Sequence, residues 1–208
     1  MIVCQVMAQG PAITPQNWAP LWSSQFTEKT WFFLQGNNSI TGTWTYQNDN
    51  TAVRQHLSRN SGKSDRYCGT IFPFENTPCN QLIMNSKRYM IFPEKKYCCT
   101  CCTSAEGCGV IKPDWAAKAD FQSTYTSQGT QINKFLIKGL QNNWYEQTAD
   151  NTGKPIRIYQ EPISDMVFDP ASYTTTPDLS VFALPTGYGD CEKSCPFLSL
   201  CTLVKFAS

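Results

Sequence analysis

The stretch ITGTWTY, residues 40–46, decides the fold class because its polarity alternates from one residue to the next. Ile40, Trp44 and Tyr46 fall on one side of an extended chain, and three threonines fall on the other. A period of two residues is typical of a strand with one buried face in an antiparallel sheet. Turn residues follow at 47–50, so residues 51–57 are predicted to return as the partner strand.

The rest of the chain continues as short apolar segments separated by turns. Residues 36–39 (GNNS) and 150–153 (DNTG) have turn chemistry, and a strand is expected to return over 155–161. Residues 114–121 are the best helix candidate, because Pro113 precedes them and Asp114 can cap the first turn. Residues 9–208 are therefore expected to form one disulfide-rich domain. We predict a β-rich α+β fold of roughly eight or more strands, a curved antiparallel sheet wrapped around one or two helices. An all-β sandwich or barrel is the alternative.

Composition excludes several classes of protein. The 208 residues are 41% hydrophobic, 13% aromatic and 16% charged. Disordered chains are rich in charge and poor in aromatic residues, so this chain is expected to fold. The net charge is +1 and no basic stripe is present, so nucleic acid is not an expected partner. No apolar run is long enough for a membrane-spanning helix, so no transmembrane segment is expected.

The 11 cysteines are clustered, which is typical of disulfides in a secreted protein or of a zinc site. Residues 98–102 (CCTCC) contain the C-x2-C spacing of zinc ligands, but no second such pair and no H-x3-5-H follows them. We therefore expect disulfides among Cys68, Cys79, Cys98, Cys99, Cys101, Cys102, Cys108, Cys191, Cys195 and Cys201. Spacing does not reveal the pairing. Bridges from the central cluster to the C-terminal cysteines would close loops of about 100 residues and restrict the unfolded chain most.

Two features near the N-terminus favour secretion. Residues 1–8 (MIVCQVMA) resemble the end of a signal peptide, since the segment is apolar and has Val6 and Ala8 at the positions that precede a cleavage site. Its removal would take away Cys4 and leave an even number of cysteines. Asn37-Asn38-Ser39 is a glycosylation sequon, and a glycan is expected on Asn37. The protein is thus predicted to be secreted or extracellular, with lysosomal delivery as an alternative.

No catalytic motif is present. The sequence lacks a nucleophile elbow, a zinc-protease helix, a phosphate-binding loop and a dinucleotide-binding glycine pattern. His56 is the single histidine and lies on a predicted strand. It is interpreted as a polar residue of the sheet face, and a catalytic base is the alternative, which a buried carboxylate beside it would favour. We expect no enzymatic activity, no catalytic residue, no metal site and no cofactor.

Several acidic residues leave two minor alternatives open. The pairs Glu146 with Asp150 and Asp165 with Asp169 offer the two carboxylates that a glycosidase needs, although solvated turns explain them equally well. Asp165 and Asp169, together with Asp120 and Asp150, are the candidate ligands for an extracellular Ca²⁺ ion, without an EF-hand pattern to support them.

Several segments, taken in order, resemble the ependymin-related proteins. They are GTWTY at 42–46, YMI at 89–91 running into Cys98 or Cys99, WY at 144–145, MVFD at 166–169, and VFALP at 181–185 followed by Cys191. The resemblance is one of pattern, spread over residues 40–195. It implies secretion or lysosomal delivery, frequent dimers, Ca²⁺ binding in some members, and a fold similar to bacterial lipoprotein carriers of the LolA type. That fold is a curved sheet around helices with a deep apolar pocket for lipids. The extra cysteines depart from the family and put the pocket mouth in doubt.

The aromatic residues, 12 Phe, 9 Tyr and 6 Trp, suggest the function. The leading hypothesis is a secreted, non-enzymatic glycoprotein that binds a hydrophobic, lipid-like small molecule in an apolar pocket. The predicted ligand contacts are Trp44, Tyr46, Phe135, Trp144 and Phe168, and core packing is the alternative for these rings. The second hypothesis is an extracellular structural or adhesive protein that self-assembles or coats a surface as a homo-oligomer. A carrier would have an apolar cavity of several hundred Å³, whereas a structural protein would have a filled core.

Overall fold

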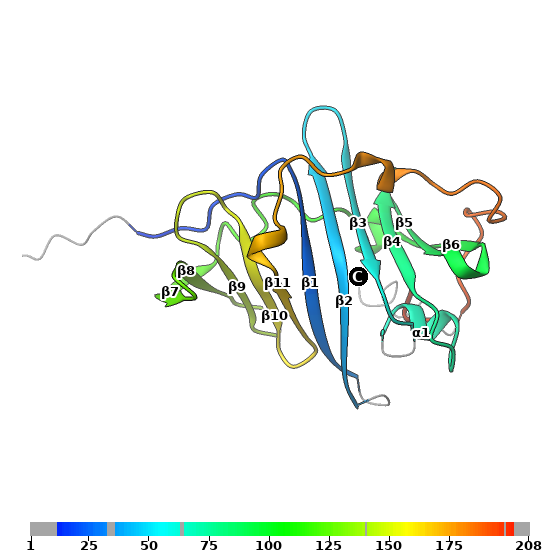
Figure 1. Cartoon of the computed structure of the whole chain (residues 1–208), viewed down its shortest axis with the longest axis horizontal. Helices are drawn as coiled ribbons and strands as arrows, with labels where there is room; N and C mark the ends of the chain where they lie inside the picture. Colours follow the sequence, from blue (N-terminus) through cyan, green and yellow to red (C-terminus); the bar gives the residue numbers. More distant parts are fainter. Residues whose placement is uncertain (1–11, 33–35, 63–64, 140, 198, 202–208) are drawn as a thin grey trace, which may run out of the picture.

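The computed structural model describes residues 12–32, 36–62, 65–139, 141–197 and 199–201. Residues 1–8, with Cys4, lie outside the described residues, so the signal-peptide prediction is not tested. In the described part of the chain, eleven strands form one antiparallel sheet, in the order β6-β5-β4-β3-β2-β1-β11-β10-β9-β8-β7 (Figure 1). The strands are β1 (Leu21–Phe32), β2 (Gly36–Asn48), β3 (Val53–Arg59), β4 (Cys79–Met84), β5 (Lys87–Phe92), β6 (Tyr97–Thr103), β7 (Asp120–Ser127), β8 (Thr130–Ile137), β9 (Asn143–Thr148), β10 (Pro155–Gln160) and β11 (Ser164–Phe168).

The α+β prediction is wrong, because the fold is nearly all-β. The described residues contain one α-helix, α1 (Cys68–Ile71), which is a single turn. They also contain four 3-10 turns: η1 (Pro93–Lys95), η2 (Ser104–Glu106), η3 (Pro170–Ser172) and η4 (Leu179–Phe182). The all-β alternative is closer, although the strands form one sheet rather than the two of a sandwich.

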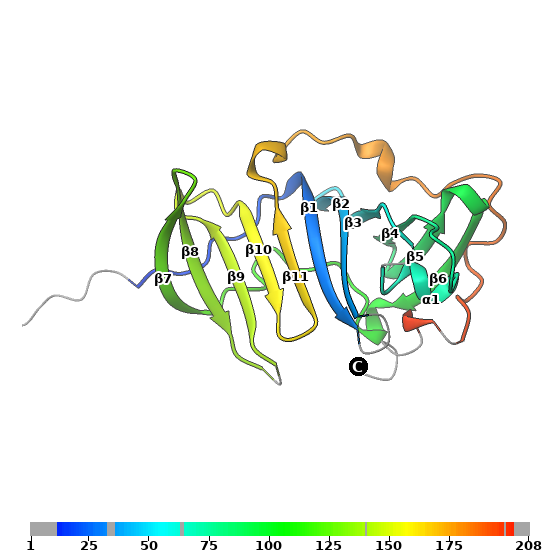
Figure 2. The same cartoon turned by 60° about the horizontal axis from the view of Figure 1, so that its bottom comes forward.

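The helix expected over 114–121 does not form. Residues 113–118 are turns whose hydrogen bonds span three residues rather than four, such as Ala117 N to Asp114 O at 2.8 Å and Ala119 N to Ala116 O at 2.9 Å. The segment belongs to the crossover, residues 107–119, which connects β6 at one edge of the sheet to β7 at the other. Figure 2 shows the crossover running over one face of the curved sheet. This face, the inner face, is therefore covered by turns and irregular chain where helices were expected.

The main core lies on the inner face, between the sheet and its cover. Trp22 is in register with Tyr46, and Phe26 faces both Gly42 and Phe168 across the neighbouring strands. The buried members of this cluster are Trp18, Trp22, Phe26, Ile40, Trp44, Tyr46, Leu57, Ala116, Phe135, Tyr145, Met166 and Phe168. Gly42 is required there, since a Cβ at this position would lie 1.9 Å from the Ser58 carbonyl oxygen and 2.7 Å from the Phe26 ring.

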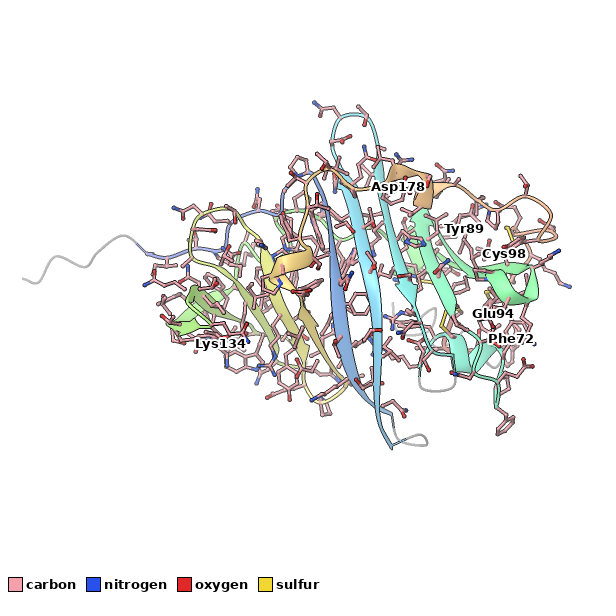
Figure 3. The ribbon with its side chains drawn as sticks, viewed as in Figure 1. Phe72, Tyr89, Glu94, Cys98, Lys134 and Asp178 are labelled. Carbon is pink, nitrogen blue, oxygen red and sulfur yellow. A yellow bond between two sulfur atoms is a disulfide. The ribbon has the colours of Figure 1, made fainter. Side chains whose placement is uncertain are left out.

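The opposite, outer face is covered over β3–β6 by the C-terminal segment. Phe182 of this segment packs on Leu82, Tyr89 and Ile91. Residues 193–195 then run beside β6, where Thr100 N donates to Lys193 O at 2.8 Å and Cys195 N donates to Thr100 O at 2.9 Å. Tyr89 and Cys98 lie at this end of the sheet, far from Lys134 at the other end (Figure 3). The tail thereby pairs with part of an edge strand that would otherwise be open.

The disulfide prediction is confirmed for all ten cysteines. The bridges are Cys68–Cys79, Cys98–Cys191, Cys99–Cys195, Cys101–Cys201 and Cys102–Cys108. Three of them join the central cluster to the tail, across sequence separations of 93, 96 and 100 residues. The zinc alternative is wrong for these cysteines, because a sulfur atom in a disulfide has no thiolate to offer a metal. The one described group with metal-ligand spacing, Asp65 with Cys68 and Cys79, contains such a bridge.

Two hairpin predictions are confirmed and one turn prediction is wrong. Residues 49–52 join β2 to β3, and residues 149–154 join β9 to β10. Residues 36–39 are the start of β2 rather than a turn, paired with the far end of β1. The side chain of Asn37 lies outside the described residues, so its glycosylation stays a prediction. No helix in the described ranges is long and apolar enough to cross a membrane.

The three bridges to the tail are expected to act as one unit in stability. With Cys99–Cys195 in place, Cys101–Cys201 closes a loop of only about eight residues, so replacing both of its cysteines by Ser should lower the free energy of unfolding by about 2 kcal/mol. Removal of all three bridges opens a loop of about 100 residues and should cost more than three times that loss. Urea denaturation measures both, and a single-bridge loss of about 4–5 kcal/mol, the value for an isolated 100-residue loop, would contradict this.

Candidate ligand-binding cavity

A half-open cavity of about 490 Å³ lies on the inner face, between the sheet and the crossover. Its walls come from strands β1 to β5, β10 and β11, from residues 66–67 beside α1, and from residues 111–115 of the crossover. The volume falls in the range of small-molecule sites. The cavity lies where the crossover leaves the inner face incompletely filled.

One side of the cavity is apolar. Trp44 and Leu57 are in register on β2 and β3, and Ile158 and Met166 are in register on β10 and β11. The side chains of Ile111 and Trp115 add to this side from the crossover. An apolar group that enters here leaves water on both its sheet side and its cover side, which is the favourable term in hydrophobic binding.

The other side of the cavity is an ionic network buried between three elements. Arg59 of β3 donates from Nη1 to Glu28 Oε2 on β1 at 2.7 Å and to Asp65 Oδ2 at 2.6 Å, and the three side chains are 1–2% exposed. Ser164 Oγ of β11 donates to Glu28 Oε1 at 2.6 Å. Burial opposes ionisation of Glu28, but the Arg59 and Arg66 charges and the Ser164 hydrogen bond outweigh it and hold the pKa of Glu28 below its usual range.

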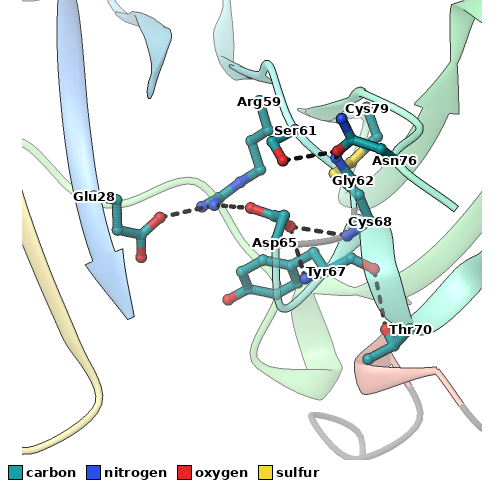
Figure 4. The surroundings of a disulfide bond; sticks show 10 residues. All are labelled: Glu28, Arg59, Ser61, Gly62, Asp65, Tyr67, Cys68, Thr70, Asn76 and Cys79. Carbon is teal, nitrogen blue, oxygen red and sulfur yellow. Dashed lines mark hydrogen bonds and ion pairs between the residues drawn. A yellow bond between two sulfur atoms is a disulfide. The ribbon is translucent and has the colours of Figure 1, made fainter. Parts of the chain in front are cut away.

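Asp65 ties this network to the first turn of α1. Its Oδ1 accepts hydrogen bonds from Tyr67 N at 2.7 Å and Cys68 N at 2.8 Å, while its other oxygen holds Arg59 (Figure 4). The Cys68–Cys79 bridge then links this turn to β4. The position of Arg59 is thus fixed by hydrogen bonds and a covalent cross-link together.

Two more arginines complete the polar side. Arg66 Nη2 lies 3.4 Å from Glu28 Oε1, and the guanidinium carbons of Arg59, Arg66 and Arg88 lie 5.0, 5.1 and 6.0 Å from the centre of the Tyr67 ring. The charge of Arg66, helped by Arg88 and Arg59, outweighs burial and lowers the pKa of Tyr67. Burial and repulsion from the other two arginines lower the pKa of Arg88. The site therefore has a strongly positive field.

Of the five predicted ligand contacts, Trp44 lines this cavity. Tyr46, Phe135 and Phe168 are buried in the main core. Trp144 is half-buried on β9, with the Lys134 Nζ atom 4.3 Å from its ring centre. The structure does not bring the five rings together around one cavity, and contact of each ring with a ligand stays a prediction.

Sequence reasoning missed Glu28, Arg59, Arg66 and Arg88. The signal was present in the strand pattern. Glu28 is an even number of residues from the buried Trp22 and Phe26 of β1, so its side chain lies on the same face of the strand as theirs. A charged residue on the buried side of an alternating strand indicates a buried ion pair or a site.

His56 lies on the outer side of β3 and is 8% exposed, with Thr45 and Leu82 opposite it on the neighbouring strands. Burial lowers the pKa of His56 to about 4. No carboxylate among the described residues pairs with the His56 ring. The buried carboxylate that would favour a catalytic base is therefore not found beside it in the described part of the chain. Absence of enzymatic activity stays a prediction.

The acidic candidates are spread out and paired individually. Asp165 accepts from Arg157 at 2.7 Å, Asp120 lies 2.7 Å from Lys138 Nζ, and Asp150 accepts from Thr148 at 2.6 Å. Asp169 accepts from Ala171 N at the start of η3. Ca²⁺ binding by these residues stays a prediction.

Comparison with known proteins gives structural neighbours and no family. No protein-family model and no curated protein matches the sequence. An uncharacterized conserved protein from Thermus thermophilus aligns with a TM-score of 0.49 at 6% identity, over 81% of this chain and 87% of that chain. The LolA superfamily protein NE2245 from Nitrosomonas europaea has a TM-score of 0.36 at 10% identity, over 82% and 91%. PNGF-II has a TM-score of 0.35 at 10% identity, over 79% of this chain and 30% of that one. A LolA superfamily protein is thus among the neighbours, and similarities this low assign no function.

Loss of the Glu28 charge is expected to destabilise the fold. Glu28→Gln leaves Arg59 and Arg66 buried with one carboxylate between them, and should lower the free energy of unfolding by about 3 kcal/mol. The matched control is Glu75→Gln, because Glu75 pairs with Lys95 on the surface and should show no measurable change. Urea denaturation compares the two variants, and equal stability of both would contradict a structural role for the buried pair.

Burial of neutral His56 predicts acid sensitivity. The unfolded chain binds a proton near the ordinary pKa of about 6.5, and the folded chain only near pH 4, so stability is lost as the pH falls between these values. The loss attributable to His56 should approach about 3 kcal/mol. His56→Gln should flatten the dependence of unfolding free energy on pH between 7 and 4, and an unchanged pH dependence in the variant would be the contrary result.

Proposed function

We propose that this protein is a secreted, non-enzymatic binder of a hydrophobic, lipid-like small molecule, held in the inner-face cavity. The observation that carries the proposal is the cavity of about 490 Å³ with an apolar side built from Trp44, Leu57, Ile158 and Met166. A preformed cavity lowers the ordering cost of binding, and each Å² of apolar ligand surface removed from water contributes roughly 25 cal/mol.

Five disulfides support the secreted part of the proposal. Such bridges form and persist outside the reducing cytosol. They also fix the shape of the sheet at the end that bears α1, and no described residue of the bridged tail is among those that line the cavity. The concern that extra bridges seal the pocket mouth is therefore not supported by their positions.

The second candidate function is self-assembly as an extracellular structural protein. Strand β7 is at the edge of the sheet, pairs with β8 on one side, and has eight exposed residues. An open edge is a template for pairing with another chain. Native mass spectrometry of the unreduced protein separates the two: a small molecule that leaves on denaturation supports the carrier, and a concentration-dependent multimer without one supports assembly.

Filling the cavity should abolish ligand binding without unfolding the protein. Ile158 is half-buried at the cavity, so Ile158→Trp places a large ring in the open space and should lower bound-ligand occupancy at least tenfold in native mass spectra. Val167→Trp is the matched control, because Val167 precedes Phe168 on β11 but is exposed on the outer face. Equal occupancy in the two variants would place the ligand outside this cavity.

A further inference from the structure

The polar side of the cavity has more positive charge than its carboxylates balance. Arg59 lies between two carboxylates, Glu28 and Asp65, and Arg66 shares Glu28. Arg88, which also lines the cavity, has no carboxylate within ion-pair distance among the described residues. Lys112 of the crossover adds a further cation to the lining.

Several residues that line the cavity have hydrogen-bond donors without acceptors. In the described part of the chain, nine buried side-chain nitrogen or oxygen atoms have no hydrogen-bond partner. Six of the nine are N–H donors of residues that line this cavity: Trp44 Nε1, Arg59 Nε, Arg66 Nε, Gln81 Nε2, Arg88 Nε and Trp115 Nε1. Buried polar groups of native proteins are nearly always satisfied, so unpaired donors concentrated in one place indicate an acceptor-rich ligand.

Internal groups do not provide the missing acceptor. The Tyr67 hydroxyl interacts with Arg88, but it is a single oxygen surrounded by three guanidinium groups. The Glu28 oxygens are already occupied by Arg59, Arg66 and Ser164. Gln81 Nε2 and Trp44 Nε1 have no acceptor among the described residues.

We infer that the cavity takes an anionic amphiphile, with a carboxylate or phosphate head group bound by Arg88, Arg66 and Gln81, and an apolar tail along Trp44, Leu57 and Met166. The inference rests on the proposed function and names the ligand class of the same cavity. A guanidinium fork matches the oxygens of a carboxylate or phosphate, and the charge-assisted hydrogen bonds that result are stronger than neutral ones. A cationic head group would neither balance the positive charge nor accept hydrogen bonds from the unpaired donors, and an uncharged head group would leave the positive charge unbalanced.

The test compares probes that share one tail. Isothermal titration of the unreduced protein is carried out with dodecanoate, dodecyl phosphate, dodecanol and inorganic phosphate. At least one of the two anionic amphiphiles is expected to bind at least tenfold more tightly than dodecanol. Arg88→Gln should weaken binding of that amphiphile at least tenfold and change the affinity for dodecanol less than twofold. Arg54→Gln is the matched control, since Arg54 lies over Phe182 on the outer face and should change neither affinity.

A second variant guards against misfolding of the first. Gln81→Met removes an unpaired donor without changing the charge, and should weaken binding of the same anionic amphiphile about threefold or more while sparing dodecanol. Equal binding of dodecanol and both anionic probes overturns the head-group inference and leaves the proposed function standing. Inorganic phosphate that binds as tightly as dodecyl phosphate also overturns it, because a free anion would then be the ligand. Failure of all amphiphiles to bind overturns both proposals.

Discussion

The rest of the structure depends on one connection, since β6 and β7 follow each other in sequence but lie at opposite edges of the sheet. With strands about 4.8 Å apart, the ten steps between them span about 48 Å along the curved sheet. Residues 104–119 would reach only about 24 Å as a helix, at about 1.5 Å per residue. The crossover therefore cannot be one helix. It runs as turns and irregular chain, and a thin layer bearing Trp115 and Ala116 covers the inner face in place of a helix. A thin cover leaves room, and the cavity lies beneath it between Ile111 and Trp115 on one side and the sheet on the other.

The buried ionic network adds little net stability to this arrangement. Taking Arg59, Glu28 and Asp65 out of water costs much of what their mutual attraction returns. The network instead fixes geometry, because it joins β1, β3 and the turn before α1 through one guanidinium group. Charged groups that are costly to bury are common at functional sites, and Arg59 and Glu28 line the cavity to which we assign the ligand.

The sequence predicted the local features well and the long-range ones poorly. Alternation over residues 40–46 and the turn at 150–153 specified hairpins correctly, because both signals are contained in a few adjacent residues. Thr45 was expected to face solvent but is buried, because the segment after β11 covers the outer face and Ser23 bonds to it at 3.1 Å. The cavity residues Glu28, Arg59, Arg88 and Ser164 come from four strands, and their meeting depends on a strand order that no local pattern reveals.

The disulfides and the positive end of the cavity occupy the same part of the fold, and this placement has a physical basis. Arg59 is in register with Cys79, Arg88 is in register with Cys102, and Arg66 is two residues before Cys68. Three like charges around one ring repel, so elements that bear them would move apart if they were held by packing alone. Covalent links at the same positions oppose that movement and keep the donors oriented, as the proposed binding of an anionic ligand requires. The bridges thus oppose the repulsion within the charged cluster, and the opposite end of the sheet, at β7, has no described disulfide and no such cluster.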